Sequence, residues 1–252
     1  MVMPLYDENP FAAPRRPVVT WSLIAANVLI FLFDGLAGDE QAVVEHFGVV
    51  PAALSGDIII PGALPPTFTL VTYMFVHAGV IHIFGNVVFL WVFGDNVEQA
   101  LGRGRFLAFY LLCGIVGALA FVVTDVHSAT PLVGASGAIA GIVIAYAMLR
   151  PCAKVTALVF GIPVRVSAYW IIGGFVMIQF INLGSASKSE VAYWCHIGGM
   201  VAGGVLLPFM RQPGVKLFEC LRPEQIEADT SPPMPDTSRL PGAPRHAPHV
   251  DT

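Results

Sequence analysis

Five polar side chains stand inside otherwise apolar stretches of this 252-residue sequence: His77, His82, Asn86, Ser136 and His196. Such groups are costly in an apolar environment, so each needs a partner, a cavity or a function. A serine hydroxyl becomes a useful nucleophile when a neighbouring base takes its proton, and a neutral histidine does this near neutral pH. Ser136 and His196 therefore indicate hydrolytic chemistry if the fold brings them together.

The residues around Ser136 leave its hydroxyl accessible. Taken alone, a serine in an apolar helix is usually structural, because its hydroxyl bonds back to a carbonyl one turn earlier. Here Gly134-Ala135-Ser136-Gly137 opens an apolar run with almost no side-chain bulk near the hydroxyl. The histidines and Asn86 also have structural alternatives, as partnered core histidines and as an amide that pairs two helices. Their positions in the fold decide between these interpretations.

The composition indicates that a lipid bilayer surrounds these residues. Hydrophobic residues make up 56% of the chain and charged residues 12%, with a mean hydropathy of +0.72, whereas a soluble domain carries about a quarter charged residues. The length has room for one compact bundle of roughly six spans of about 20 residues. We therefore predict an all-α, polytopic membrane protein with six transmembrane helices. The apolar runs that predict them are 18–33, 70–93, 106–123, 134–149, 166–181 and 191–210.

Basic residues orient the predicted bundle. If the N-terminus is cytoplasmic, twelve of the thirteen Lys and Arg residues lie inside and only Lys188 lies outside, which satisfies the positive-inside rule. Both termini are then cytoplasmic. The first outer loop, about 34–69, contains no Lys or Arg and enough aliphatic residues to lie partly in the membrane interface. We expect three parts: a cytoplasmic segment (1–17), the six-span domain (18–210) and a disordered, proline-rich cytoplasmic tail (211–252).

Depth in the membrane places four of the polar groups in one layer. With Arg150 at the inner interface, Ser136 lies about 21 Å above it and about 9 Å below the outer surface. Span four is thus too short to cross alone, and its N-terminus must end in a protein-lined depression. His196 lies about 7 Å below the same surface.

The second span is positioned from its inner end, where the acidic residues Asp95 and Glu98 mark the cytoplasmic interface. Counting back about twenty residues starts this helix near Gly79. His82 then lies about 5 Å and Asn86 about 10 Å below the outer surface. A shared cavity explains this common depth better than separate structural roles.

Small residues provide the means of bringing two of these spans together. Gly137 and Gly141 form a GxxxG pattern on span four, and Gly199 and Gly203 form another on span six. Glycines at this spacing let helix backbones approach closely in membranes. The two patterns predict that Ser136 and His196 come within hydrogen-bonding distance.

Over about residues 15–210, the sequence resembles the rhomboid family of intramembrane proteases. The matching motifs are His77-Ala-Gly-Val-Ile-His82-Ile-Phe-Gly-Asn86, Gly134-Ala-Ser136-Gly-Ala-Ile-Ala-Gly141 and His196-Ile-Gly-Gly199. The resemblance implies a rhomboid-like six-helix bundle and a serine endopeptidase that cuts transmembrane protein substrates near the outer side of the membrane. The expected location is a bacterial inner membrane, with substrates and membrane lipid as partners.

The same resemblance assigns roles to the polar residues. It implies a catalytic dyad of Ser136 and His196, with His82 and Asn86 near the oxyanion. No acidic residue lies near His196 in the sequence, which favours a dyad over a triad. Where the family often has an aromatic residue four positions after the nucleophile, this chain has Ala140, so Tyr193 or Trp194 is a candidate to support the imidazole. The supporting positions are His77, Gly134 and Gly137.

Two other functions would also explain buried polar groups. One is a catalytically inactive, rhomboid-like protein that binds membrane clients, which the intact Ser136 and His196 disfavour. The other is a small transporter, for which the sequence lacks visible internal repeats. A serine-reactive probe would separate a protease from either of them.

Cofactors and nucleic acid are not expected. The absence of an HExxH motif disfavours a membrane metalloprotease, and the absence of a pair of mid-span aspartates disfavours an aspartyl protease. We expect neither a metal nor a cofactor. Lys and Arg are scattered instead of forming a basic patch, so we expect no nucleic-acid partner. Four cysteines show no CxxC spacing, so we expect ordinary thiols and neither a disulfide nor a zinc site. They are Cys113, Cys152, Cys195 and Cys220.

Overall fold

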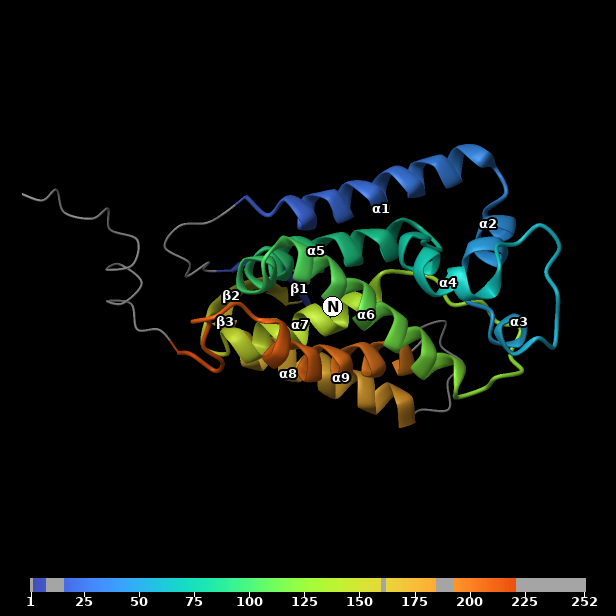
Figure 1. Cartoon of the computed structure of the whole chain (residues 1–252). Coiled ribbons are helices and arrows are strands. Elements are labelled where there is room, and N and C mark those ends of the chain that lie inside the picture. Colours follow the sequence, from blue (N-terminus) through green and yellow to red (C-terminus); the bar gives the residue numbers. More distant parts are fainter. Residues whose placement is uncertain (1, 8–15, 160–161, 185–192, 221–252) are drawn as a thin grey trace, which may run out of the picture.

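Four helices in the computed structural model are long and apolar enough to cross a membrane (Figure 1). The structure describes residues 2–7, 16–159, 162–184 and 193–220, and these four are the helices of that length among them. Two shorter apolar helices, α7 (Ser136–Leu149) and α8 (Ala168–Gly184), lie beside them. The predicted count of six spans therefore stays a prediction. The four long helices are α1 (Val18–Ala37), α5 (Val80–Leu101), α6 (Arg103–Val122) and α9 (Tyr193–Met210).

Helix α7 forms the centre of the bundle and packs against α5, α6 and α9. Its 14 residues extend about 21 Å, which is less than the thickness of the hydrocarbon layer. The N-terminal end of α7 lies inside the protein, where Gly134 N–H donates to the carbonyl oxygen of Tyr73. This confirms the expectation that the fourth apolar segment is short and begins against protein.

Short helices connect α1 to α5 and gather at one end of the bundle (Figure 1). They are α2 (Glu40–Phe47), α3 (Pro51–Ser55), α4 (Pro66–Thr72) and the 3-10 helix η1 (Tyr73–Phe75). Val49 and Leu132 exchange backbone hydrogen bonds, so this connection is tied to the segment that leads into Ser136. The connection therefore forms a cap on the end of the bundle where α7 begins.

Three short strands at the opposite end correct the expectation of a purely helical chain (Figure 1). Strand β2 (Lys154–Val159) pairs antiparallel with both β1 (Val2–Asp7) and β3 (Ile162–Ser167), in the order β1-β2-β3. Val155 and Ala157 are fully buried while their neighbours are partly exposed, the alternation of a half-buried strand. The chain is mostly helical, with a small sheet built from the expected N-terminal segment and from the connection between the fourth and fifth apolar runs.

Asp7 anchors β1 to the bundle. Its Oδ2 accepts hydrogen bonds from the Tyr146 hydroxyl on α7 at 2.7 Å and from Asn96 Nδ2 on α5 at 2.9 Å. Burial raises the pKa of the Asp7 carboxyl from 3.8 to about 6, reinforced by the nearby Asp95 carboxylate and opposed by both hydrogen bonds. Burial thus makes Asp7 easier to protonate than an ordinary aspartate, while the two hydrogen bonds of the anchor favour the ionised form.

We expect Asp7→Asn to remove a pH-dependent loss of stability. Because the folded-state pKa is raised, the contribution of Asp7 to stability is fully present below about pH 4 and falls by roughly 2–3 kcal/mol as the pH rises through about 6. Asparagine carries no charge, and its amide oxygen still accepts from Tyr146 and Asn96. The Tm of the variant should exceed that of the parent by an amount that grows between pH 4 and pH 7. A constant difference over that range would contradict the prediction.

A disulfide between Cys152 and Cys220 contradicts the prediction of four ordinary thiols. The two cysteines are 68 positions apart, so sequence spacing did not reveal a pairing that only the fold creates. Arg150 also forms an ion pair with Glu219, and Gln212 N–H donates to the carbonyl oxygen of Ala100. Residues 211–220 are therefore attached to the bundle. Cys113 and Cys195 are free and buried.

Two other predictions fall on residues outside the described ranges. The predicted tail lies there from residue 221 onward, and so does Lys188. The proposed domain boundaries at 17/18 and 210/211 remain predictions.

Candidate active site

Ser136 and His196 meet where α7 and α9 begin. Ser136 is the first residue of α7, and His196 lies in the first turn of α9. The distance between Ser136 Oγ and His196 Nε2 is 2.8 Å, which is a hydrogen bond. Two residues 60 positions apart thus form the contact that a nucleophile and its base require.

Glycines allow α7 and α9 to approach this closely. A β-carbon at Gly199 would collide with the carbonyl oxygen of Gly137, and one at Gly203 would collide with that of Gly141. Contact between backbones therefore replaces contact between side chains along the two helices. The interpretation of the paired GxxxG patterns is confirmed.

Gln179 on α8 holds the other side of the histidine ring. Its Oε1 lies 2.9 Å from His196 Nδ1, and both side chains are buried. An amide oxygen only accepts hydrogen bonds, so with this amide assignment the proton of the neutral imidazole is on Nδ1. Nε2 then has a free lone pair that accepts from the Ser136 hydroxyl. The chain Gln179–His196–Ser136 leaves the imidazole in the tautomer that a general base needs.

Sequence reasoning missed Gln179. The available signal was a strongly hydrogen-bonding amide near the end of the apolar run 166–181, of the same kind as the five polar residues that were singled out. Of the two aromatic candidates for supporting His196, Tyr193 lies edge-on to the imidazole with ring centroids 6.4 Å apart. Trp194 is 43% exposed. Phe175 of α8 adds a second ring at 6.5 Å.

His82 and Asn86 lie on the α5 side of the same site. Gly134 has a φ of +111°, and a β-carbon there would be 2.5 Å from His82 Nε2 and 3.8 Å from Asn86 Nδ2. The His82 ring thus lies against the backbone two residues before Ser136. Asn86 Nδ2 donates one hydrogen bond to the His82 carbonyl at 3.0 Å. Because an amide nitrogen carries two hydrogens, one donor is left over.

The two remaining predicted residues, Gly137 and His77, lie at different distances from Ser136 and His196. Gly137 is required for packing, since a β-carbon there would be 2.5 Å from Cys195 Sγ. His77 packs edge-to-face on His82 with ring centroids 5.2 Å apart, and within the described residues neither of its ring nitrogens makes a hydrogen bond of normal geometry. The structure thus brings together His82, Asn86, Gly134, Ser136, Gly137 and His196, with His77 one ring further away.

The side chains in the described part of the chain also bear on whether a metal ion could be held. Among residues 2–7, 16–159, 162–184 and 193–220, no group of three or more His, Cys, Asp or Glu side chains is placed to hold a metal ion. The polar groups around Ser136 are a hydroxyl, imidazoles and amides. This set suits acyl transfer without a metal ligand shell.

Comparison with known proteins gives consistent similarities. A family model described as the Rhomboid domain matches residues 66–213. The chain is 32% identical over 193 residues to "Rhomboid protease GluP" of Bacillus subtilis (strain 168), which covers 75% of this chain and 34% of that protein. It is 30% identical over 152 residues to "RHOMBOID-like protein 6, mitochondrial" of Arabidopsis thaliana, covering 59% of this chain and 46% of that one.

A human protein is also similar. The chain is 29% identical over 119 residues to "Presenilin-associated rhomboid-like protein, mitochondrial" of Homo sapiens, covering 46% of this chain and 29% of that protein. The chain therefore matches less than half the length of each of these three relatives. Since the family model matches more than half of the sequence, and since the site residues lie within that match, the chain belongs to the rhomboid family.

Proposed function

We propose that this chain is an intramembrane serine endopeptidase that hydrolyses peptide bonds of transmembrane protein substrates. It is an integral membrane protein with several apolar helices. The observation that carries the proposal is the 2.8 Å contact between Ser136 Oγ and His196 Nε2, with Gln179 at Nδ1 of the same ring. The similarity to a relative named a rhomboid protease supports it.

The proposed reaction uses Ser136 as nucleophile and His196 as acid and base. Oγ attacks the carbonyl carbon of the scissile bond while Nε2 takes the hydroxyl proton. The imidazolium then gives this proton to the amine nitrogen as the C–N bond breaks, which leaves an acyl ester on Ser136. Water attacks the ester, Nε2 takes a proton from that water, and the proton returns to Oγ as the acid leaves.

The oxyanion of each tetrahedral intermediate needs donors that are already in place. The backbone N–H of Ser136 at the start of α7 is one candidate, since the amides at a helix N-terminus are unpaired and lie at its positive end. The free N–H of Asn86 is the second, and the His82 ring beside Gly134 is the third. These groups come from two helices that already contact one another, so little rearrangement is required during the reaction.

The six-span topology is part of the same proposal. The positive-inside pattern supports two cytoplasmic termini, with the α2–α4 end of the bundle facing outward and the sheet end facing the cytoplasm. A bacterial inner membrane is the proposed location, although two of the relatives compared above carry mitochondrial names. The cut would then fall near the outer end of the substrate helix, at the depth of Ser136.

The test is cleavage of a transmembrane reporter by the purified, full-length protein in lipid vesicles. Mass spectrometry should map the cut to the outer third of the reporter helix, and a fluorophosphonate probe should label Ser136. A cut on the sheet side of the bundle would contradict the topology. Reporter binding without cleavage or labelling would instead support the inactive, client-binding alternative.

Gln179 is expected to act as a positioning residue. Gln179→Met keeps the size of the side chain but removes the acceptor at Nδ1, so the ring loses its fixed tautomer. An aspartate in the corresponding place of a triad contributes about 10⁴-fold, and a neutral amide should contribute less, so kcat should fall about 10- to 100-fold with KM unchanged. Gln179→Glu restores an acceptor and should recover most of the rate. A structural role would instead lower Tm in both variants without this difference in kcat.

A further inference from the structure

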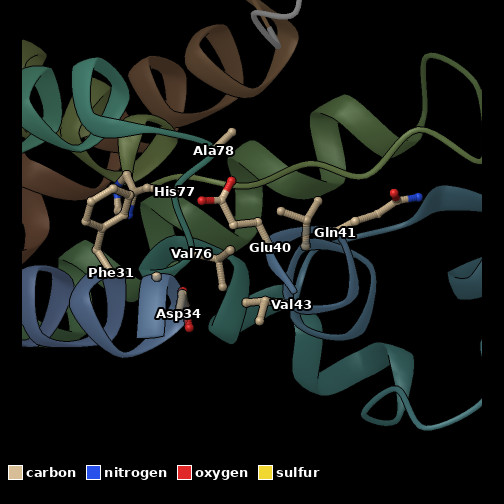
Figure 2. Close-up of a pocket in the computed structure, with 10 residues that line it drawn as sticks. Phe31, Asp34, Glu40, Gln41, Val43, Val76, His77 and Ala78 are labelled. Carbon is tan, nitrogen blue, oxygen red and sulfur yellow. The ribbon is translucent and has the colours of Figure 1, made fainter. Parts of the chain in front are cut away.

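A cavity of about 250 Å³ lies between the C-terminal part of α1, the start of α2 and the segment Val76–Ala78 that leads into α5 (Figure 2). One part of its wall is apolar and the other carries oxygen and nitrogen atoms. Residues from all three segments converge on it in Figure 2. The apolar wall includes Phe31, Val43, Val44 and Val76, and the polar wall is formed by Asp34, Glu40, Gln41 and His77.

The polar wall is acidic and incompletely satisfied. Asp34 and Glu40 contribute two carboxylates, and no Lys or Arg lines the cavity. Asp34 Oδ2 is buried without a hydrogen-bond partner among the described residues. His77 is only 6% exposed, and within the described residues neither ring nitrogen makes a hydrogen bond of normal geometry, although the Phe75 backbone interacts weakly with the ring. Buried polar atoms are rarely left unpaired, so the three unpaired atoms of Asp34 and His77 indicate that a polar group from another molecule binds here.

The chemistry of the wall selects the kind of ligand. Two carboxylates attract a cation and repel an anion, and the neutral imidazole of His77 offers one further acceptor. The apolar wall suits the aliphatic stem of a long side chain, because Lys and Arg bury their methylene groups and keep the charged end among polar partners. The volume is below the range of about 300–1,000 Å³ typical of drug-sized ligands, and it suits a single side chain.

The cavity lies next to the proposed catalytic residues. His77 packs on His82, and His82 lies against Gly134, two residues before Ser136. Two imidazole rings therefore separate the cavity from the backbone at the nucleophile. A substrate bound at Ser136 in an extended conformation advances about 3.3 Å along its chain with each residue. A residue a few positions from the cut bond would therefore reach the cavity.

Resting on the proposed function above, we propose that this cavity is a specificity pocket for a lysine or arginine side chain of the substrate. The basic residue lies beside the cut bond, on the side of the membrane where α7 begins. Basic residues are uncommon on the outer flanks of transmembrane helices. The pocket would therefore select a small class of membrane proteins.

The experiment compares lysine with glutamine at each of about six positions on either side of the cut in the reporter. At one position the parent protein should cleave the lysine reporter about 10- to 100-fold better in kcat/KM, the range for a charge-assisted hydrogen bond. Combining Asp34→Asn with Glu40→Gln should bring the lysine-to-glutamine ratio towards one. Should the double variant not fold, Glu40→Lys at an exposed position replaces it and should favour a glutamate reporter at the same position.

Glu45→Gln is the matched control. Glu45 is on the same helix as Glu40 and its carboxylate accepts from Gln41, a bond that the amide oxygen of glutamine preserves. It does not line this cavity, so the variant should keep the lysine preference. Loss of the preference in Glu45→Gln would mean that general negative charge, and not the cavity, attracts lysine, which would overturn the proposal.

Binding to a Ser136→Ala variant separates this proposal from the proposed function. If the parent cuts the glutamine reporters but no lysine position improves cleavage, the pocket is refuted and the protease stands. If nothing is cut but Ser136→Ala binds one lysine reporter with a lower Kd than its glutamine partner, the pocket stands without the protease. Equal Kd values together with no cleavage refute both.

Lipid ammonium groups are the competing source of a cation. The comparison should be made in vesicles of phosphatidylglycerol alone and of phosphatidylglycerol with phosphatidylethanolamine. A lysine preference in both supports the substrate pocket. A preference that vanishes when phosphatidylethanolamine is added would assign the cavity to a lipid headgroup and overturn the proposal.

Discussion

Ser136→Ala is expected to abolish cleavage of the reporter, with kcat falling by about 10⁴- to 10⁶-fold. Without Oγ there is no acyl acceptor, and the hydrogen bond to His196 Nε2 is lost. His196→Ala should cost about as much, and the double variant little more, because a nucleophile and its base act as a unit. Steady-state kinetics in vesicles with Tm as a folding check measures all three.

Cys195→Ala is the matched control for this prediction. Cys195 adjoins His196 and carries a potential nucleophile, but consecutive helical positions point about 100° apart. Its sulfur lies 3.7 Å from the Tyr73 hydroxyl and packs against Gly137. The alanine variant should therefore keep the parental rate at some cost in Tm. Activity that survives Ser136→Ala but not Cys195→Ala would reverse the assignment of the nucleophile.

The long helices were predictable because membrane burial requires long apolar runs. The start of α5 shows where this signal fails. The apolar run begins at residue 70, but α4 and η1 occupy that part, and α5 begins only at Val80. Counting back about twenty residues from the acidic end of the run predicted a start near Gly79. Hydropathy alone does not distinguish a span from a short apolar helix that packs beside it.

Glu98 shows a second kind of contact that the sequence did not reveal. As an acidic residue near the end of a span it was interpreted only as a marker of the membrane interface. In the structure it is 3% exposed and accepts hydrogen bonds from the backbone N–H groups of Val19 and Thr20 and from the Thr20 hydroxyl. It thus satisfies free amides at the start of α1. Contacts between residues 78 and 79 positions apart have no local sequence pattern.

The same reason explains the missed sheet and disulfide. Strand β1 pairs residues 2–7 with residues 155–159, and Cys152 pairs with Cys220. Neither partner is identifiable without the fold. In the site, Ser136, His196, His82 and Asn86 were identifiable because depth along a helix is a local count. Gln179 was missed because no depth was assigned to the fifth apolar segment, although the same count applies to it.

Two roles for Asn86 fit the structure, and an experiment separates them. In the first role, Asn86 Nδ2 only donates a hydrogen bond to the carbonyl oxygen of His82 in the same helix, at 3.0 Å. In the other, its second N–H stabilises the oxyanion next to Ser136. A hydrogen bond of the first kind, from a side chain to a carbonyl within the same helix, contributes to stability, whereas an oxyanion donor acts mainly in the transition state. The two roles therefore differ in which measurement they change.

Asn86→Ala is expected to lower kcat by roughly 10- to 1,000-fold with little change in KM or Tm. Asn27→Ala is the matched control, because Asn27 is also buried and also donates Nδ2 to the carbonyl four residues earlier, on α1. The control should lose as much Tm as Asn86→Ala while keeping kcat. His82→Ala should reduce kcat as well, and more severely, since removing the ring also opens space against Gly134. If Asn86→Ala cleaves at the parental rate, or loses kcat only in proportion to unfolded protein, its oxyanion role is refuted while the pairing of Ser136 with His196 stands.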